Sequence, residues 1–124
     1  MTRLLLFSAI IEVLAGLGAM FAPSVLGRLL LAADIPEADA PLVRLCGVAL
    51  LALGVACWLV RSDVQGRSAR ALSSAMLVYN LGAVITLGAA GMLSQPVGVA
   101  LWPAVILHAA MAGWCISALL AKPT

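Results

Sequence analysis

Four polar side chains stand inside long apolar stretches of this sequence: Glu12, Arg44, Asn80 and His108. An ionisable residue at membrane depth costs roughly a few kcal/mol, so its presence there marks a candidate for function. A carboxyl and an imidazole can exchange protons, and all four groups can hydrogen-bond a polar ligand. We therefore predict that these four residues bind a ligand or couple proton movement.

The composition places these groups in a membrane protein. Hydrophobic residues make up 65% of the 124 residues and charged residues 10%, with a mean hydropathy of +1.18. A soluble domain carries about 25% charged residues. A net charge of +2 without a basic stripe excludes a nucleic-acid partner. The length allows one small domain, residues 1–124. The lipid bilayer is the partner that this composition predicts.

Four apolar stretches are long enough to cross a bilayer, which takes roughly 20 residues each. They cover residues 4–21, 42–60, 71–93 and 99–120. Because no period-2 alternation runs through them, they are predicted to be helices. The predicted fold class is all-α: a polytopic membrane protein with a four-helix transmembrane bundle. A cleavable signal peptide is the competing interpretation of the first stretch, and Glu12 within the apolar region argues against it.

The connections predict how these spans are arranged. Residues 23–30 open with proline and repeat apolar residues at helical spacing, which predicts a short amphipathic helix in the first external loop. The short, uncharged segment 91–98 predicts a tight antiparallel hairpin of the third and fourth spans. Most basic residues fall on the side of the termini and the second loop: Arg3, Arg61, Arg67, Arg70 and Lys122. This bias predicts a multi-pass protein with both termini in the cytoplasm.

Counting residues from the nearest cytoplasmic charge gives each polar group a depth. Glu12 and Asn80 both lie about 14–15 Å deep, near the midplane. His108 lies at about 21 Å and Arg44 at about 25 Å, near the outer boundary. Each belongs to a stripe that faces neighbouring helices, so all four are expected to converge on one interior. Glu12 and His108 are expected to be coupled, directly or through Asn80 or a water molecule. Tyr79, on a different helix face from Asn80, is a weaker candidate.

A structural interpretation competes with this one. In it, Glu12 is held by Asn80 or His108 and merely specifies the bundle, while Arg44 extends to the outer headgroups. Metal or haem binding finds less support, because the sequence has one histidine and metal sites need several converging ligands. The three cysteines lack C-x-x-C spacing, and no catalytic motif occurs. Small-residue stripes exceed what one bundle needs, which predicts a homodimer or a larger membrane complex.

Two segments carry a family resemblance. Phe21-Ala22-Pro23 leads into the external segment, and Arg44-Leu45-Cys46-Gly47 opens the second span. In this layout the chain resembles the small four-helix bacterial membrane proteins of the DoxX-like kind, which implies the bacterial cytoplasmic (inner) membrane. Some of those are associated with quinone-linked oxidoreductases, which implies a bound lipid or quinone. A membrane-embedded glutamate in the first of four spans is also similar to the small multidrug resistance transporters, although Arg44 and His108 have no counterpart there.

These observations predict a non-enzymatic membrane protein. It is expected to be an accessory subunit of a membrane complex, or a binder of a small lipid-like ligand such as a quinone in a polar-lined cavity. The alternative is a proton-coupled small-molecule transporter that acts as a dimer through Glu12. A third interpretation is a membrane lipid isomerase or hydrolase with Glu12 and His108 as an acid–base pair.

Overall fold

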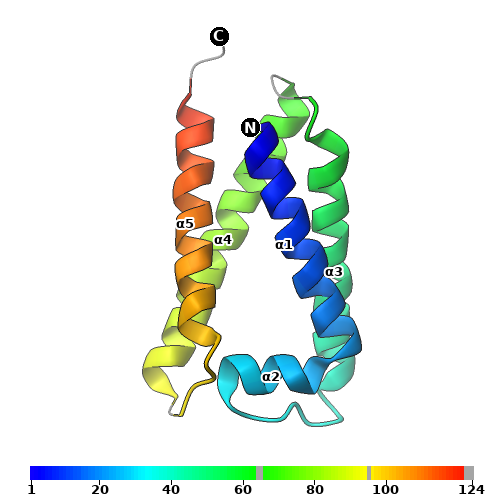
Figure 1. The fold of residues 1–124 in the computed structure, drawn as a ribbon, viewed down its shortest axis with the longest axis vertical. Coiled ribbons are helices and arrows are strands. Elements are labelled where there is room, and N and C mark those ends of the chain that lie inside the picture. Colours follow the sequence, from blue (N-terminus) through cyan, green and yellow to red (C-terminus); the bar gives the residue numbers. More distant parts are fainter. Residues whose placement is uncertain (64–65, 95, 122–124) are drawn as a thin grey trace.

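The computed structural model describes residues 1–63, 66–94 and 96–121, which fold into five helices without a strand. The four long helices and the short α2 are, in chain order, α1 (Thr2–Phe21), α2 (Pro23–Leu31), α3 (Ala40–Val60), α4 (Arg67–Leu93) and α5 (Leu101–Leu120) (Figure 1). The predicted all-α fold is confirmed in these ranges. Each of the four long helices is long and apolar enough to cross a membrane.

The short helix expected after the first apolar stretch is present as α2. It starts at Pro23, whose fixed φ suits a first turn and whose missing N–H needs no partner there. It ends at Leu31, and the capping residue Ala32 that follows takes a left-handed φ of 52°. In its last turn, Arg28 Nε donates to Asp34 Oδ1 at 2.5 Å, and this hydrogen bond raises the pKa of Arg28. Both side chains are exposed, so the ion pair orients the turn and adds little stability.

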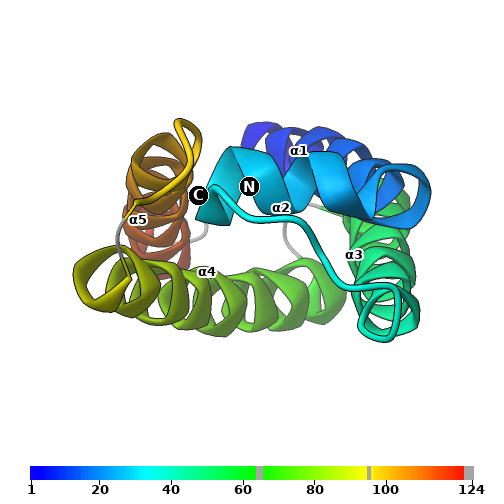
Figure 2. The same cartoon turned by 90° about the horizontal axis from the view of Figure 1, so that it is seen from below.

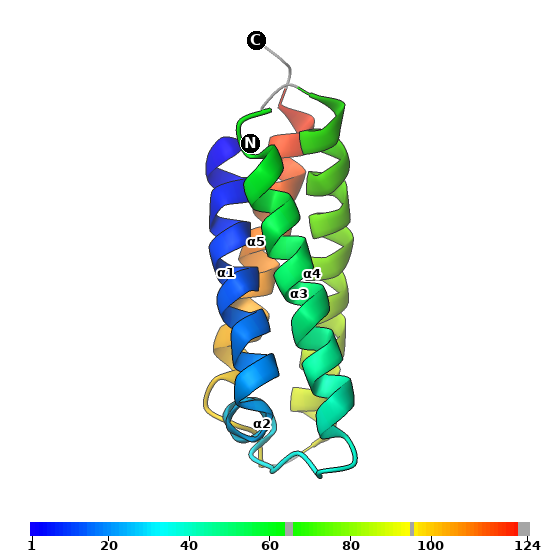
Figure 3. The same cartoon turned by 90° about the vertical axis from the view of Figure 1, so that its right-hand side faces the viewer.

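The long helices associate as two pairs, α1 with α3 and α4 with α5, and few contacts join one pair to the other (Figures 1 and 3). The predicted hairpin of the last two spans is thus present. Between α1 and α3, glycines let the backbones approach closely. A Cβ on Gly16 would lie 2.7 Å from the carbonyl oxygen of Gly47, and a Cβ on Gly47 would lie equally close to that of Gly16. Such close helix contacts are typical of membrane bundles.

The apolar core lies toward the end of the bundle where α1 starts and α5 ends. Its buried cluster draws on all four long helices: Leu4, Leu5, Ala9, Cys57, Ala69, Met76, Met111 and Cys115. Toward α2 the two helix pairs diverge (Figure 1). The bundle is therefore closely packed at one end and more open at the other.

α2 lies across the open end, beneath the space between the two helix pairs (Figure 2). The backbone N–H groups of Gly98 and Ala100 donate to the carbonyl oxygens of Leu30 and Leu29, at 3.1 and 2.8 Å. Carbonyls in the last turn of a helix have no partner within the helix, so these bonds satisfy groups that would otherwise need water. They tie α2 to the second helix pair. They also explain why α5 begins at Leu101, two residues later than predicted.

Candidate functional site

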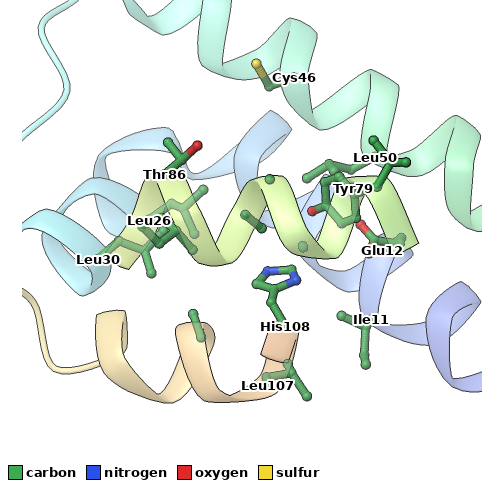
Figure 4. A pocket seen from close by; sticks show the side chains of 16 residues that line it. Ile11, Glu12, Leu26, Leu30, Cys46, Leu50, Tyr79, Thr86, Leu107 and His108 are labelled. Carbon is green, nitrogen blue, oxygen red and sulfur yellow. The ribbon is translucent and has the colours of Figure 1, made fainter. Parts of the chain in front are cut away.

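A cavity of about 690 Å³ lies between the two helix pairs, in the half of the bundle next to α2. Its volume falls within the range of small-molecule sites, roughly 300–1,000 Å³. Most of its wall is apolar and includes Leu26 and Leu30 of α2 and Leu87 of α4. Figure 4 shows Glu12, Tyr79 and His108 gathered away from the α2 leucines. The cavity is thus amphipathic, with a polar end and an apolar end.

The cavity opens on the side of the bundle. Val78 lines it and is 72% exposed, and Gly82 and Thr86, also on its α4 wall, are exposed as well. Cys46 is exposed on the facing wall, which α3 provides. The cavity is therefore open between α3 and α4, which have few contacts with each other, and Leu107, exposed on α5, lines it as well.

Glu12 is buried at the polar end of the cavity, with 2% of its surface exposed. The Tyr79 hydroxyl lies within hydrogen-bonding reach of its carboxyl group. One carboxyl oxygen of Glu12, Oε2, has no hydrogen-bond partner in the described ranges. The hydroxyl oxygen Oγ of Ser8, one helical turn earlier, has none there either. An unpaired buried polar group costs about 1–3 kcal/mol. A hydrogen-bonding group of a ligand would remove that cost.

Asn80 and His108 form a hydrogen-bonded pair between α4 and α5. Nδ1 of His108 lies 2.8 Å from Oδ1 of Asn80, and Nδ2 of Asn80 donates to the Met76 carbonyl at 2.7 Å. Asn80 is 1% exposed and does not line the cavity, whereas His108 does. Asn80 therefore holds the imidazole from behind while the ring faces the cavity.

Tyr79 connects the two groups that were expected to be coupled. Its ring contacts the His108 ring edge to face, with centroids 5.6 Å apart and an interplanar angle of 82°. Its hydroxyl reaches toward Glu12. Tyr79, which the sequence marked only weakly, thus interacts with both Glu12 and His108. The available signal was the single tyrosine of the chain, placed mid-helix beside Asn80.

Arg44 does not join the other three polar residues. Its side chain is exposed on α3, and it does not line the cavity. The interior on which four polar groups were expected to converge holds Glu12, Asn80 and His108, together with Tyr79. Arg44 lies in the second turn of α3.

The cysteines are free thiols, with Cys57 and Cys115 buried in the core and Cys46 exposed at the cavity wall. Within the ranges that the structure describes, no group of three or more His, Cys, Asp and Glu side chains could hold a metal ion. The site therefore offers hydrogen-bonding groups rather than a ligand set for a metal.

Comparisons with family models, with curated proteins and with solved structures give no match to this chain.

Proposed function

We propose that this chain is a multi-pass membrane protein that binds a small lipid-like molecule, such as a quinone, without chemically transforming it. The outer surface supports the membrane location, because large apolar side chains such as Leu14, Leu59 and Ile85 are 65–70% exposed on separate helices. A surface of this kind is stable in lipid and prone to association in water.

The observation that carries the binding proposal is the amphipathic cavity. An elongated ligand would place its polar group against Glu12, Tyr79 and His108 and its apolar part along the leucines of α2 and α4. The side opening between α3 and α4 would admit it directly from the bilayer. Such a ligand would remain in an apolar environment throughout its entry.

Filling the cavity should remove the ligand. Ala83 lines the cavity on α4, so Ala83→Phe should occupy ligand space, whereas Ala89→Phe on the same helix adds the same ring at an exposed position outside it. Native mass spectrometry of gently solubilised protein should show a bound molecule on wild type and Ala89→Phe, and none on Ala83→Phe. An equal adduct on all three proteins, or none on wild type, would contradict the proposal.

We propose that both termini face the cytoplasm of a bacterial inner membrane. The start of α1, the end of α3, the start of α4 and the end of α5 lie at the end opposite α2 (Figure 1). The basic residues Arg3, Arg61, Arg67 and Arg70 are near that end, while Lys122, which belongs to the same argument, lies outside the described residues.

Cysteine labelling in a Cys46→Ser background tests this orientation. A cysteine at exposed position 37 should react with an impermeant maleimide added outside, and one at exposed position 67 only after the membrane is opened. The reverse pattern would overturn the orientation.

We also propose a homodimer or a larger membrane complex. Gly18 and Gly113 have open space where a Cβ would lie, so these small residues are not used in packing within the chain. Small residues on a membrane helix favour contact with another helix. The native mass spectra described above test this too, and monomers alone in several mild detergents would contradict it.

A further inference from the structure

Only one of the two flipped orientations of the Asn80 side-chain amide satisfies its hydrogen bond to Met76. Its Nδ2 lies 2.7 Å from the Met76 carbonyl oxygen, to which an amide N–H donates. Turning the amide over would place Oδ1 against that carbonyl, oxygen to oxygen, and would lose the hydrogen bond. Asn80 therefore presents Oδ1, an acceptor, toward α5.

This acceptor determines where the proton sits on His108. Nδ1 lies 2.8 Å from Oδ1 of Asn80, and two acceptors cannot form a hydrogen bond, so Nδ1 carries the hydrogen. In a neutral imidazole the other nitrogen is then without a proton. The neutral His108 ring thus offers Nε2 as a hydrogen-bond acceptor.

No group in the described part of the chain donates a hydrogen bond to Nε2 of His108. The one side-chain hydrogen bond of the ring is the bond from Nδ1 to Asn80. Tyr79, whose ring lies against His108, directs its hydroxyl toward Glu12. His108 lines the cavity, and Figure 4 shows its ring extending into the space between α4 and α5. A donor for Nε2 must therefore come from what occupies the cavity.

We propose that the polar end of the ligand is a neutral hydroxyl group that donates a hydrogen bond to Nε2 of His108, with Asn80 as the positioning residue. This inference rests on the proposed function and names the ligand class: an alcohol, a phenol, or a quinone in its reduced hydroquinone form. An oxidised quinone has only carbonyl acceptors and leaves Nε2 unpaired. An ammonium group would donate, but in a largely apolar cavity its charge would need an ionised Glu12 as its partner, whereas a hydroxyl needs none.

Binding of a matched pair of probes tests the ligand class. In lipid nanodiscs, para-nonylphenol should bind wild type about tenfold more tightly than its methyl ether, which keeps the shape and loses the donor. Dodecanol and its methyl ether form a second pair, in which the hydroxyl is aliphatic instead of aromatic. Tighter binding of dodecanol than of its methyl ether supports the proposal equally. In His108→Phe, the preference of each hydroxyl probe over its ether should disappear. Equal or tighter binding of the ethers to wild type would overturn the proposal.

The tautomer is tested without any ligand. The chain has one histidine, so ¹⁵N-histidine labelling gives a single pair of ring nitrogen resonances. In the neutral state these should show a protonated Nδ1 and a bare Nε2, and Asn80→Leu should abolish this preference. A neutral ring protonated at Nε2 in wild type would overturn the proposal even if the cavity binds both probes. If neither probe binds while the tautomer is as expected, the failure lies with the proposed function and the ligand class falls with it.

Discussion

Replacing Glu12 with leucine should yield a protein that no longer retains a ligand and that is more stable than ligand-free wild type. Oε2 of Glu12 is buried without a partner, and removing such a group should raise the free energy of unfolding by about 1–3 kcal/mol. Tyr79 lines the cavity, so its hydroxyl keeps access to open space after the carboxyl group is gone. A stability gain that accompanies a loss of binding is expected where a polar group is retained for function.

Denaturant unfolding of ligand-free samples measures the stability, and native mass spectrometry of gently solubilised protein measures ligand retention. Glu12→Gln is the matched control, because it keeps the length of the side chain and a polar group and so should not give the stability gain. If Glu12→Leu is less stable than ligand-free wild type, Glu12 holds the bundle together, as in the structural interpretation, and our assignment of the site is wrong.

Gly16→Val should have the largest effect on folding. Even the first carbon of the new side chain would lie 2.7 Å from the Gly47 carbonyl oxygen and 2.9 Å from the Leu51 backbone nitrogen. Backbone atoms cannot move aside without separating α1 from α3, so we expect a loss of about 2–3 kcal/mol. Gly88→Val on α4 is the control, since nothing lies within 4 Å of a Cβ there. Equal losses for the two variants in denaturant unfolding would contradict the described α1–α3 contact.

The helices could be predicted from the sequence because hydropathy and length decide them locally. The four apolar stretches became α1, α3, α4 and α5, and the proline and apolar spacing of residues 23–30 became α2. The boundaries that differed depend on other features. α4 begins at Arg67, earlier than its apolar stretch, because Arg70 N–H already bonds to the Gly66 carbonyl through a polar first turn. α5 begins later because its preceding residues bond to α2, which is distant in the sequence.

The site was only partly predictable. Glu12, Asn80 and His108 were detectable because polar groups in apolar helices are costly, and counting residues gave their depths. Depth does not give the rotation of a helix about its axis or its tilt. For this reason the sequence could not show that Arg44 lies outside the cavity, nor that Tyr79, next to Asn80, lines it. The cavity itself arises from the divergence of two helix pairs, which no local pattern encodes.

Photolabelling tests most directly whether the cavity holds a ligand. A diazirine-bearing alkylphenol should react in nanodiscs, and excess para-nonylphenol should suppress labelling at cavity residues such as Leu50, Val78 and Leu107 on three different helices. Labelling of Ile85 and Ile116, which are exposed and do not line the cavity, should persist under competition because lipid-facing sites do not saturate. Uniform labelling that competition leaves unchanged, or suppression at Ile85 and Ile116 alone, would contradict a ligand site between the two helix pairs.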